Sequence, residues 1–282
     1  MASSTSSPVP RRLVGVQTKM YLSLAQTRAY IDSLIGHLAG GAAAPAAQVD
    51  IFILVDHVSL AAAVSQWEAS PARGAVNLLV GAQDASPEDS GAFTGQVSPA
   101  VLAEAGCGIV MVGHAERRRM FGETDALVAR KAAAVARHGM VPLVCVGETT
   151  RGVGVAAAAA GHDDGPDGIP GVAAAVAECR AQIEAVLGAV PEGGEVVLAY
   201  EPVWAIGAEE PAAAGYVVAV ARGIRALECV RGRKGAVRIV YGGSAGPGLF
   251  EGVKDGVDGL FLARFGLDAA RFATVIEEVA RA

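Results

Sequence analysis

The chain has 282 residues, of which 52% are hydrophobic and 18% charged, so it is long enough to form one large domain with a sizeable core. Its formal net charge of −6 excludes a nucleic-acid-binding role that rests on neutralising phosphates, although a locally basic cleft can still hold a small anion. No apolar stretch is long and unbroken enough to predict a membrane-spanning helix.

The N-terminal segment and the cysteines indicate where the protein works. Residues 1–11 are rich in Ser and Pro and lack an apolar core, so they are predicted to be a disordered lead-in and not a signal peptide. The four cysteines are widely spaced and form no CxxC pair. This usage favours reduced thiols, and we therefore expect a cytoplasmic protein.

Eight short apolar runs rich in β-branched residues recur along the chain, each followed by a helical pattern. The predicted strands are residues 13–17, 51–55, 76–81, 108–113, 141–146, 196–200, 237–241 and 259–263. The predicted helices are residues 22–38, 59–69, 98–105, 124–138, 172–188, 212–230, 246–254 and 268–281. Ser98-Pro99 and Asp268 are expected to begin two of these helices, because serine and aspartate cap free backbone N–H groups.

Near-continuous apolar runs are typical of strands that are covered on both faces, as in a parallel sheet. Eight β-α units without a second domain's worth of sequence therefore predict a single α/β domain over residues 12–282, folded as a closed (β/α)8 TIM barrel. A doubly wound sheet is disfavoured because no Gly-rich turn follows the first strand. Residues 156–170 do not fit a minimal barrel and are predicted to be a surface insertion.

Proton-transfer residues follow three of the predicted strands. Lys19 follows the first strand, His114 the fourth and Glu201 the sixth. The carboxyl ends of barrel strands meet at one face, so these side chains are expected to lie together. A carboxylate in an apolar pocket can remove a proton from a carbon beside a carbonyl, and a cation can stabilise the resulting oxyanion. Lys19 can alternatively be a Schiff-base lysine, as in some barrel aldolases.

The segments around these residues resemble the triosephosphate isomerase family from about Leu13 to the C-terminus. The resemblance rests on Gly113-His114-Ala115-Glu116-Arg117-Arg118, Tyr200-Glu201-Pro202-Val203-Trp204-Ala205-Ile206-Gly207 and Tyr241-Gly242-Gly243-Ser244. It implies that Glu201 is the base, that His114 is a neutral electrophile, that Lys19 holds an anionic substrate and that Glu116 lies in the active site. It also implies a lid after Glu201, a small phosphorylated sugar as substrate, and neither a cofactor nor a metal ion.

The expected substrate-binding residues are where the sequence departs from the family. The resemblance assigns the phosphate to Gly207, Gly243 and Ser244, but Ala263 and Arg264 stand where the family has Gly-Gly. Arg264 either grips the phosphate or points outward. Near the reacting carbonyl, Gln17 replaces the family's asparagine.

Retained proton-transfer groups with altered surroundings predict the same reaction on a different sugar phosphate. We expect the substrate to be a tetrulose phosphate and the reaction to convert L-erythrulose 1-phosphate to D-erythrulose 4-phosphate. Two alternatives remain open: a triosephosphate isomerase of glycolysis and gluconeogenesis, and a sugar-phosphate-binding barrel with weak or no turnover. The segment 83–95 resembles the family's loop that reaches into a second subunit, which predicts a homodimer.

Overall fold

The computed structural model describes residues 11–151, 169–207, 212–243 and 245–282. Eight parallel strands, hydrogen-bonded in sequence order from β1 to β8 with β8 beside β1, form a closed barrel. The strands are β1 Leu13–Gln17, β2 Asp50–Val55, β3 Asn77–Ala82, β4 Ile109–Val112, β5 Val141–Val146, β6 Val196–Tyr200, β7 Val237–Tyr241 and β8 Gly259–Leu262. The predicted TIM barrel is thus confirmed, and every strand boundary lies within one residue of its prediction.

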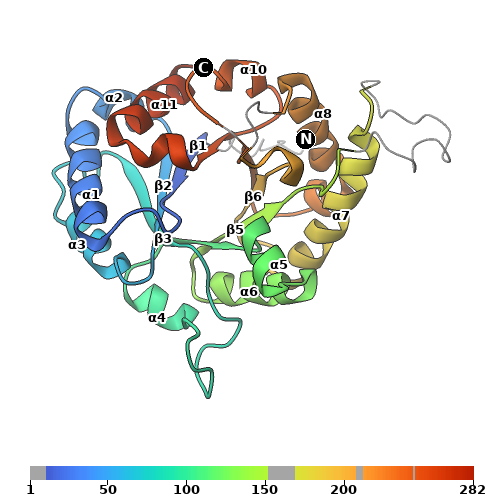
Figure 1. The fold of residues 1–282 in the computed structure, drawn as a ribbon, viewed down its shortest axis with the longest axis horizontal. Helices are drawn as coiled ribbons and strands as arrows, with labels where there is room; N and C mark the ends of the chain where they lie inside the picture. Colours follow the sequence, from blue (N-terminus) through green and yellow to red (C-terminus); the bar gives the residue numbers. More distant parts are fainter. Residues whose placement is uncertain (1–10, 152–168, 208–211, 244) are drawn as a thin grey trace, which may run out of the picture.

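Helices surround the barrel as an outer ring (Figure 1). They are α1 Leu24–Ala39, α2 Ala43–Ala46, α3 Leu60–Glu68, α4 Pro99–Glu104, α5 Ala115–Phe121, α6 Asp125–Arg137, α7 Val172–Ala189, α8 Ala214–Ala226, α9 Glu228–Arg231, α10 Phe250–Val253 and α11 Ala269–Arg281, with 3-10 turns η1 Val203–Ala205 and η2 Arg264–Leu267. Ser98 and Asp268 cap α4 and α11 as predicted. None of the described helices is long and apolar enough to cross a membrane.

The structure differs from the predicted helices in several places, and the short α2 is one element that was not predicted. Helix α5 was not expected, because none of its residues is buried and it therefore has no apolar periodicity. Residues 246–254 form only the single turn α10, since Pro247 and Gly248, with φ of +83°, interrupt a helix. The helix predicted over residues 212–230 breaks at Leu227, whose backbone is extended.

The core has two layers, one inside the barrel and one between the strands and the helices. Phe52 and Phe261 pack inside the barrel with their ring centroids 5.3 Å apart, whereas neighbouring side chains such as Ile51 and Ile53 face the helices. Gly15 makes this interior possible, because a Cβ atom there would lie 2.0 Å from the Phe52 ring. The filled interior leaves the carboxyl ends of the strands as a rigid platform for a site.

The predicted lead-in and insertion lie outside the described residues except for Arg11, Ile169 and Pro170. Segment 83–95, predicted to contact a second subunit, is described and protrudes from the barrel between β3 and α4 (Figure 1).

Candidate active site

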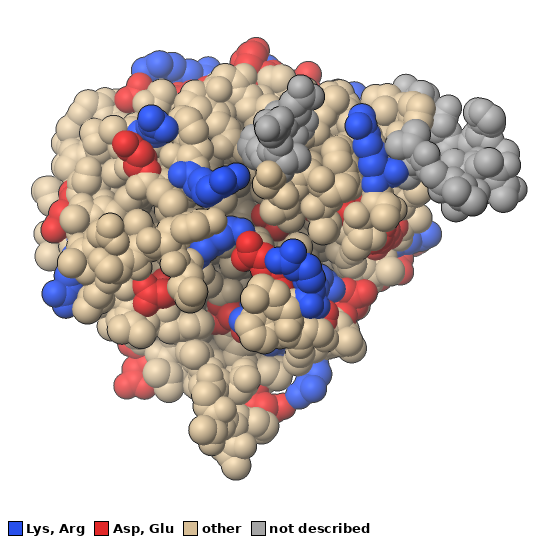
Figure 2. Space-filling model, in the orientation of Figure 1, with Lys and Arg blue, Asp and Glu red and all other residues tan. Residues whose placement is uncertain are grey.

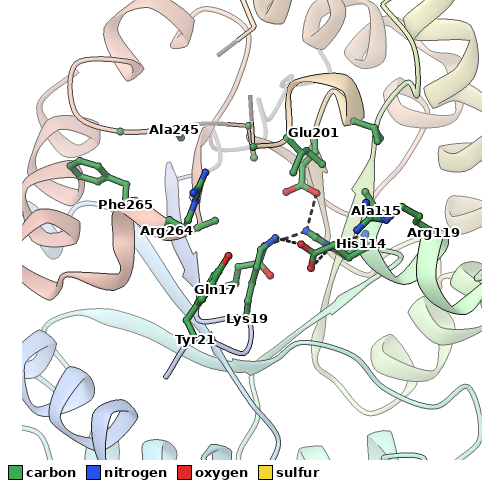
Figure 3. Close-up of a pocket in the computed structure, with 18 residues that line it drawn as sticks. Gln17, Lys19, Tyr21, His114, Ala115, Arg119, Glu201, Ala245, Arg264 and Phe265 are labelled. Atoms are coloured by element: carbon green, nitrogen blue, oxygen red, sulfur yellow. Dashed lines mark hydrogen bonds and ion pairs between the residues drawn. The ribbon is translucent and has the colours of Figure 1, made fainter. Parts of the chain in front are cut away.

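A cavity of about 640 Å³ opens at the carboxyl ends of the strands (Figure 3). Each sequence-predicted site residue that the structure describes lines it: Gln17, Lys19, His114, Glu116, Glu201, Gly207, Gly243, Ala263 and Arg264. Ser244 lies outside the described residues. The barrel thus brings together side chains that are up to 247 residues apart in the sequence, from Gln17 to Arg264.

His114 is held at the start of α5 in a defined orientation. Its Nδ1 accepts a hydrogen bond from the backbone N–H of Glu116 at 3.2 Å, so the proton of the neutral imidazole is on Nε2. The ring is almost fully buried, and Nε2 lies 3.4 Å from the Gln17 side-chain amide and 3.7 Å from Glu201 Oε2. A donor nitrogen therefore faces the carboxylate across the cavity.

Glu201 is a buried carboxylate at the end of β6, with 4% of its surface exposed. Its Oε2 atom is buried without a hydrogen-bond partner among the described residues. Gly242 allows this position, because a Cβ atom there would lie 2.6 Å from Glu201 Cγ. Burial raises the pKa of Glu201, although the nearby His114 and Lys19 oppose the shift. A poorly solvated carboxylate is a stronger base than one in water.

Lys19 is fixed by its backbone and by an ion pair. It has a φ of +46°, which is unusual for a residue with a side chain, and Gln83 Nε2 donates to its carbonyl oxygen at 3.0 Å. Its Nζ lies 2.6 Å from Glu116 Oε1. Burial alone would raise the pKa of Glu116, but the hydrogen bond from Lys19 and the nearby positive charges lower it, which favours the carboxylate form of Glu116.

Two arginines at the rim of the cavity are not paired in this way. Arg264 in η2 and Arg119 in α5 are exposed, and neither makes a hydrogen bond or ion pair with another described residue. They lie on opposite sides of the cavity, with Glu201, His114 and Lys19 between them (Figure 3). Figure 2 shows basic side chains around the hollow in this face, with acidic ones between them. An acidic protein thus presents a locally basic mouth, which suits an anionic ligand.

Sequence reasoning missed a buried carboxylate behind the cavity wall. Glu148, which follows β5, is 1% exposed, and its Oε1 accepts hydrogen bonds from Trp204 Nε1 at 2.8 Å, Tyr216 OH at 2.9 Å and Tyr200 OH at 3.3 Å. The Trp204 and Tyr216 rings also pack edge to face at 5.9 Å. This cluster holds the turn that follows Glu201. Its only sequence signal was a carboxylate at a strand end.

Asp56 and His57, which directly follow β2, make local contacts. The Asp56 carboxylate accepts hydrogen bonds from Val58 and Ser59, and His57 lies 2.9 Å from the Asp84 carbonyl oxygen. Within the described ranges, no group of three or more His, Cys, Asp or Glu side chains is arranged to hold a metal ion.

Fold and site together define a (β/α)8 barrel protein with carboxylate, imidazole and ammonium groups in one cavity at the carboxyl ends of its strands, the place where such barrels carry their active sites. The sequence model of the family described as triosephosphate isomerase matches residues 12–161 and 171–279. The chain belongs to the triosephosphate isomerase family and is a sugar-phosphate isomerase.

Its curated relatives carry two names. A Pectobacterium atrosepticum protein named L-erythrulose-1-phosphate isomerase is 40% identical over 270 residues, which cover 94% of each chain. A Rhizobium meliloti protein of the same name is 34% identical, covering 95% of this chain and 97% of the relative. A Syntrophotalea carbinolica protein named triosephosphate isomerase is 36% identical, covering 90% of this chain and 94% of the relative.

Proposed function

We propose that the chain interconverts L-erythrulose 1-phosphate and D-erythrulose 4-phosphate. The observation that carries the proposal is the buried Glu201 carboxylate facing His114 Nε2 at 3.7 Å, beside the Lys19 ammonium, in one cavity. The names of the Pectobacterium and Rhizobium relatives support the choice of a four-carbon substrate.

In the proposed reaction, Glu201 removes the proton from the hydroxyl-bearing carbon next to the ketone. The C–H electron pair forms the carbon–carbon double bond of an enediolate, and the ketone oxygen takes the negative charge. Lys19 and the Nε2–H of His114 stabilise that charge, and His114 moves a proton between the two oxygens. Triosephosphate isomerase itself pairs a glutamate base with a neutral histidine in this way, so these two roles come to the chain from its family.

Glu201 then returns the proton to the carbon that carried the ketone, and the carbonyl forms on its neighbour. Atoms and electrons balance within the substrate, so the step needs no cofactor. We assign the phosphate to Gly207, Gly243, Ser244, Ala263 and Arg264, and the reacting oxygens to Gln17, His114 and Lys19. Glu116 keeps the Lys19 ammonium in position through their ion pair.

Triosephosphate isomerase activity is the second candidate, favoured by the name of the Syntrophotalea relative. The test is kcat/KM for the purified enzyme on L-erythrulose 1-phosphate and dihydroxyacetone phosphate, measured side by side. We expect a preference of about a hundredfold for the tetrulose, which corresponds to about 2.7 kcal/mol in the transition state. A comparable preference for the triose would replace the proposal with the second candidate, and turnover of neither would leave a sugar-phosphate-binding barrel.

We also propose that the enzyme is a cytoplasmic homodimer. Large apolar side chains are exposed after β1, within segment 83–95 and at the end of α5, namely Met20, Phe93, Met120 and Phe121, which are 97%, 47%, 64% and 66% exposed. Covering them with a second copy would remove apolar surface from water. Sedimentation equilibrium should give twice the chain mass, and Phe93→Glu should shift the equilibrium towards the monomer. A wild-type monomer at micromolar concentration would refute the dimer.

A further inference from the structure

The substrate cavity has two chemically different ends. At one end lie Ala245 and Arg264, and at the other end Ala115 and Arg119 (Figure 3). Glu201 and His114, which we assign to the reacting carbons, lie between them. A substrate that directs its phosphate to the first end must direct any carbon beyond the reacting pair to the second.

A second cavity adjoins the second end. This cavity of about 600 Å³ lies between α5, α6 and α7, and it shares Ala115, Arg119, Glu201 and Val203 with the substrate cavity. Glu201 Oε2, buried and without a hydrogen-bond partner among the described residues, belongs to a side chain that lines both spaces. The two cavities are therefore neighbours on either side of the Glu201 side chain.

Ala115 is part of the lining that the two cavities share, so the size of its side chain affects the room left there. It is the first residue of α5, follows His114 directly and is half-buried. Its side chain is a single methyl group, which adds no polar atom and little volume to the lining that the two cavities share. A larger side chain at this position would occupy the space into which a substrate carbon has to extend.

Arg119 is the polar side chain available to a hydroxyl group on such a carbon. Its neighbour Arg118 is committed, with Nε donating to the Gly113 carbonyl at 2.8 Å and a second nitrogen to Asp125. Gln182, on the far side of the second cavity, bonds both the N–H and the carbonyl of Gly147. Arg119 lines both cavities and makes no hydrogen bond or ion pair with another described residue.

We propose that Ala115 and Arg119 form the subsite for the hydroxymethyl group that distinguishes a tetrulose phosphate from a triose phosphate. Ala115 leaves the space, and the Arg119 guanidinium donates a hydrogen bond to the terminal hydroxyl. Specificity for the longer ketose is thus set at the end opposite the phosphate, and the substitutions at Ala263 and Arg264 act on both substrates alike. This inference rests on the proposed function.

The test compares the same substitution at the two ends of one cavity. Ala115→Val adds bulk at the proposed subsite, and Ala245→Val adds it at the phosphate end. We expect Ala115→Val to lower kcat/KM for L-erythrulose 1-phosphate about fiftyfold more than for dihydroxyacetone phosphate, since mismatched bulk in a fitted pocket discriminates by about 10- to 200-fold. Ala245→Val should lower kcat/KM for the two substrates by factors that agree within about threefold, because both substrates carry the phosphate.

Arg119→Gln provides a second variant on an exposed position, where folding is not at stake. It should lower kcat/KM for the tetrulose about tenfold and leave the triose value within about twofold, as expected for loss of one charge-assisted hydrogen bond. Residual triose activity in each variant reports that the chain is folded. An equal loss on both substrates in Ala115→Val and in Arg119→Gln would overturn the subsite.

A binding measurement separates this inference from the proposed reaction. Glycerol 3-phosphate and erythritol 4-phosphate cannot isomerise and differ by one hydroxylated carbon. Calorimetry should show that Ala115→Val weakens erythritol 4-phosphate at least tenfold more than glycerol 3-phosphate. If the enzyme has no turnover but Ala115→Val gives that result, the proposed function is wrong and the subsite stands. If the enzyme is active but Ala115→Val weakens both ligands equally, the subsite is wrong and the proposed function stands.

Discussion

The polar side chains in the centre of the cavity are held differently from those at its two ends. In the centre, Lys19 is paired with Glu116, and His114 is held by the backbone of its own helix. At the ends, Arg119 and Arg264 are exposed and make no ion pair with another described residue. Groups that must keep a fixed geometry through a reaction are thus restrained by the protein, and groups that suit an incoming ligand are left available to it.

The largest expected effect comes from disturbing the centre. Glu201→Asp shortens the side chain by one methylene and withdraws the carboxylate from the substrate carbon, so kcat should fall about a hundredfold to a thousandfold, the range of general base catalysis. Steady-state kinetics measures the loss, and calorimetry with glycerol 3-phosphate should find its affinity almost unchanged. A kcat within about threefold of wild type would remove Glu201 from the role of base.

A smaller effect is expected at the phosphate end. Arg264→Gln should raise KM about tenfold for both the triose and the tetrulose with little change in kcat, because it removes uniform binding of about 1.4 kcal/mol. Arg222→Gln, at an exposed position on α8, is the control for the loss of one charge. If KM does not change, Arg264 points away from the substrate and the two rim arginines differ in function.

The smallest effect concerns stability. Because burial raises the pKa of Glu201, the folded state binds this proton more tightly than the unfolded state, and the group's contribution to stability falls as the pH rises through that interval. Glu201→Gln removes the contribution, so its free energy of unfolding relative to wild type should increase from pH 4 to pH 7.

Urea unfolding at several pH values measures that difference. Glu104→Gln, at an exposed position of α4, is the matched control. A relative stability of Glu201→Gln that falls with rising pH would contradict the raised pKa of Glu201.

The sequence was most informative where burial is complete on both faces. All strands were predicted within one residue because their side chains face either the barrel interior or the helices, which makes each run mostly apolar. Helix α5 was not predicted because none of its residues is buried. The first turn of that helix nevertheless holds His114 and Glu116, which were found through motif resemblance and not through periodicity.

The candidate site was predictable at strand ends and unpredictable where distant segments meet. Lys19, His114 and Glu201 each end or follow a strand, so the barrel topology alone brings them together. The Glu148 cluster joins β5, η1 and α8, and no local pattern predicts that pairing. The place of Ala115 between two cavities depends on the shape of those cavities, which no local sequence pattern predicts either. The catalytic and binding roles of the site residues stay predictions.

The hydrogen bond between Trp204 and Glu148 also gives the enzyme an intrinsic optical reporter. The chain has two tryptophans, and the other, Trp67, is buried in α3. The Trp204 indole lies next to cavity-lining Val203, donates to a carboxylate and has the Arg151 guanidinium over its ring. In a Trp67→Phe background, we therefore expect the fluorescence emission of Trp204 to change when a ligand fills the cavity, with no attached dye.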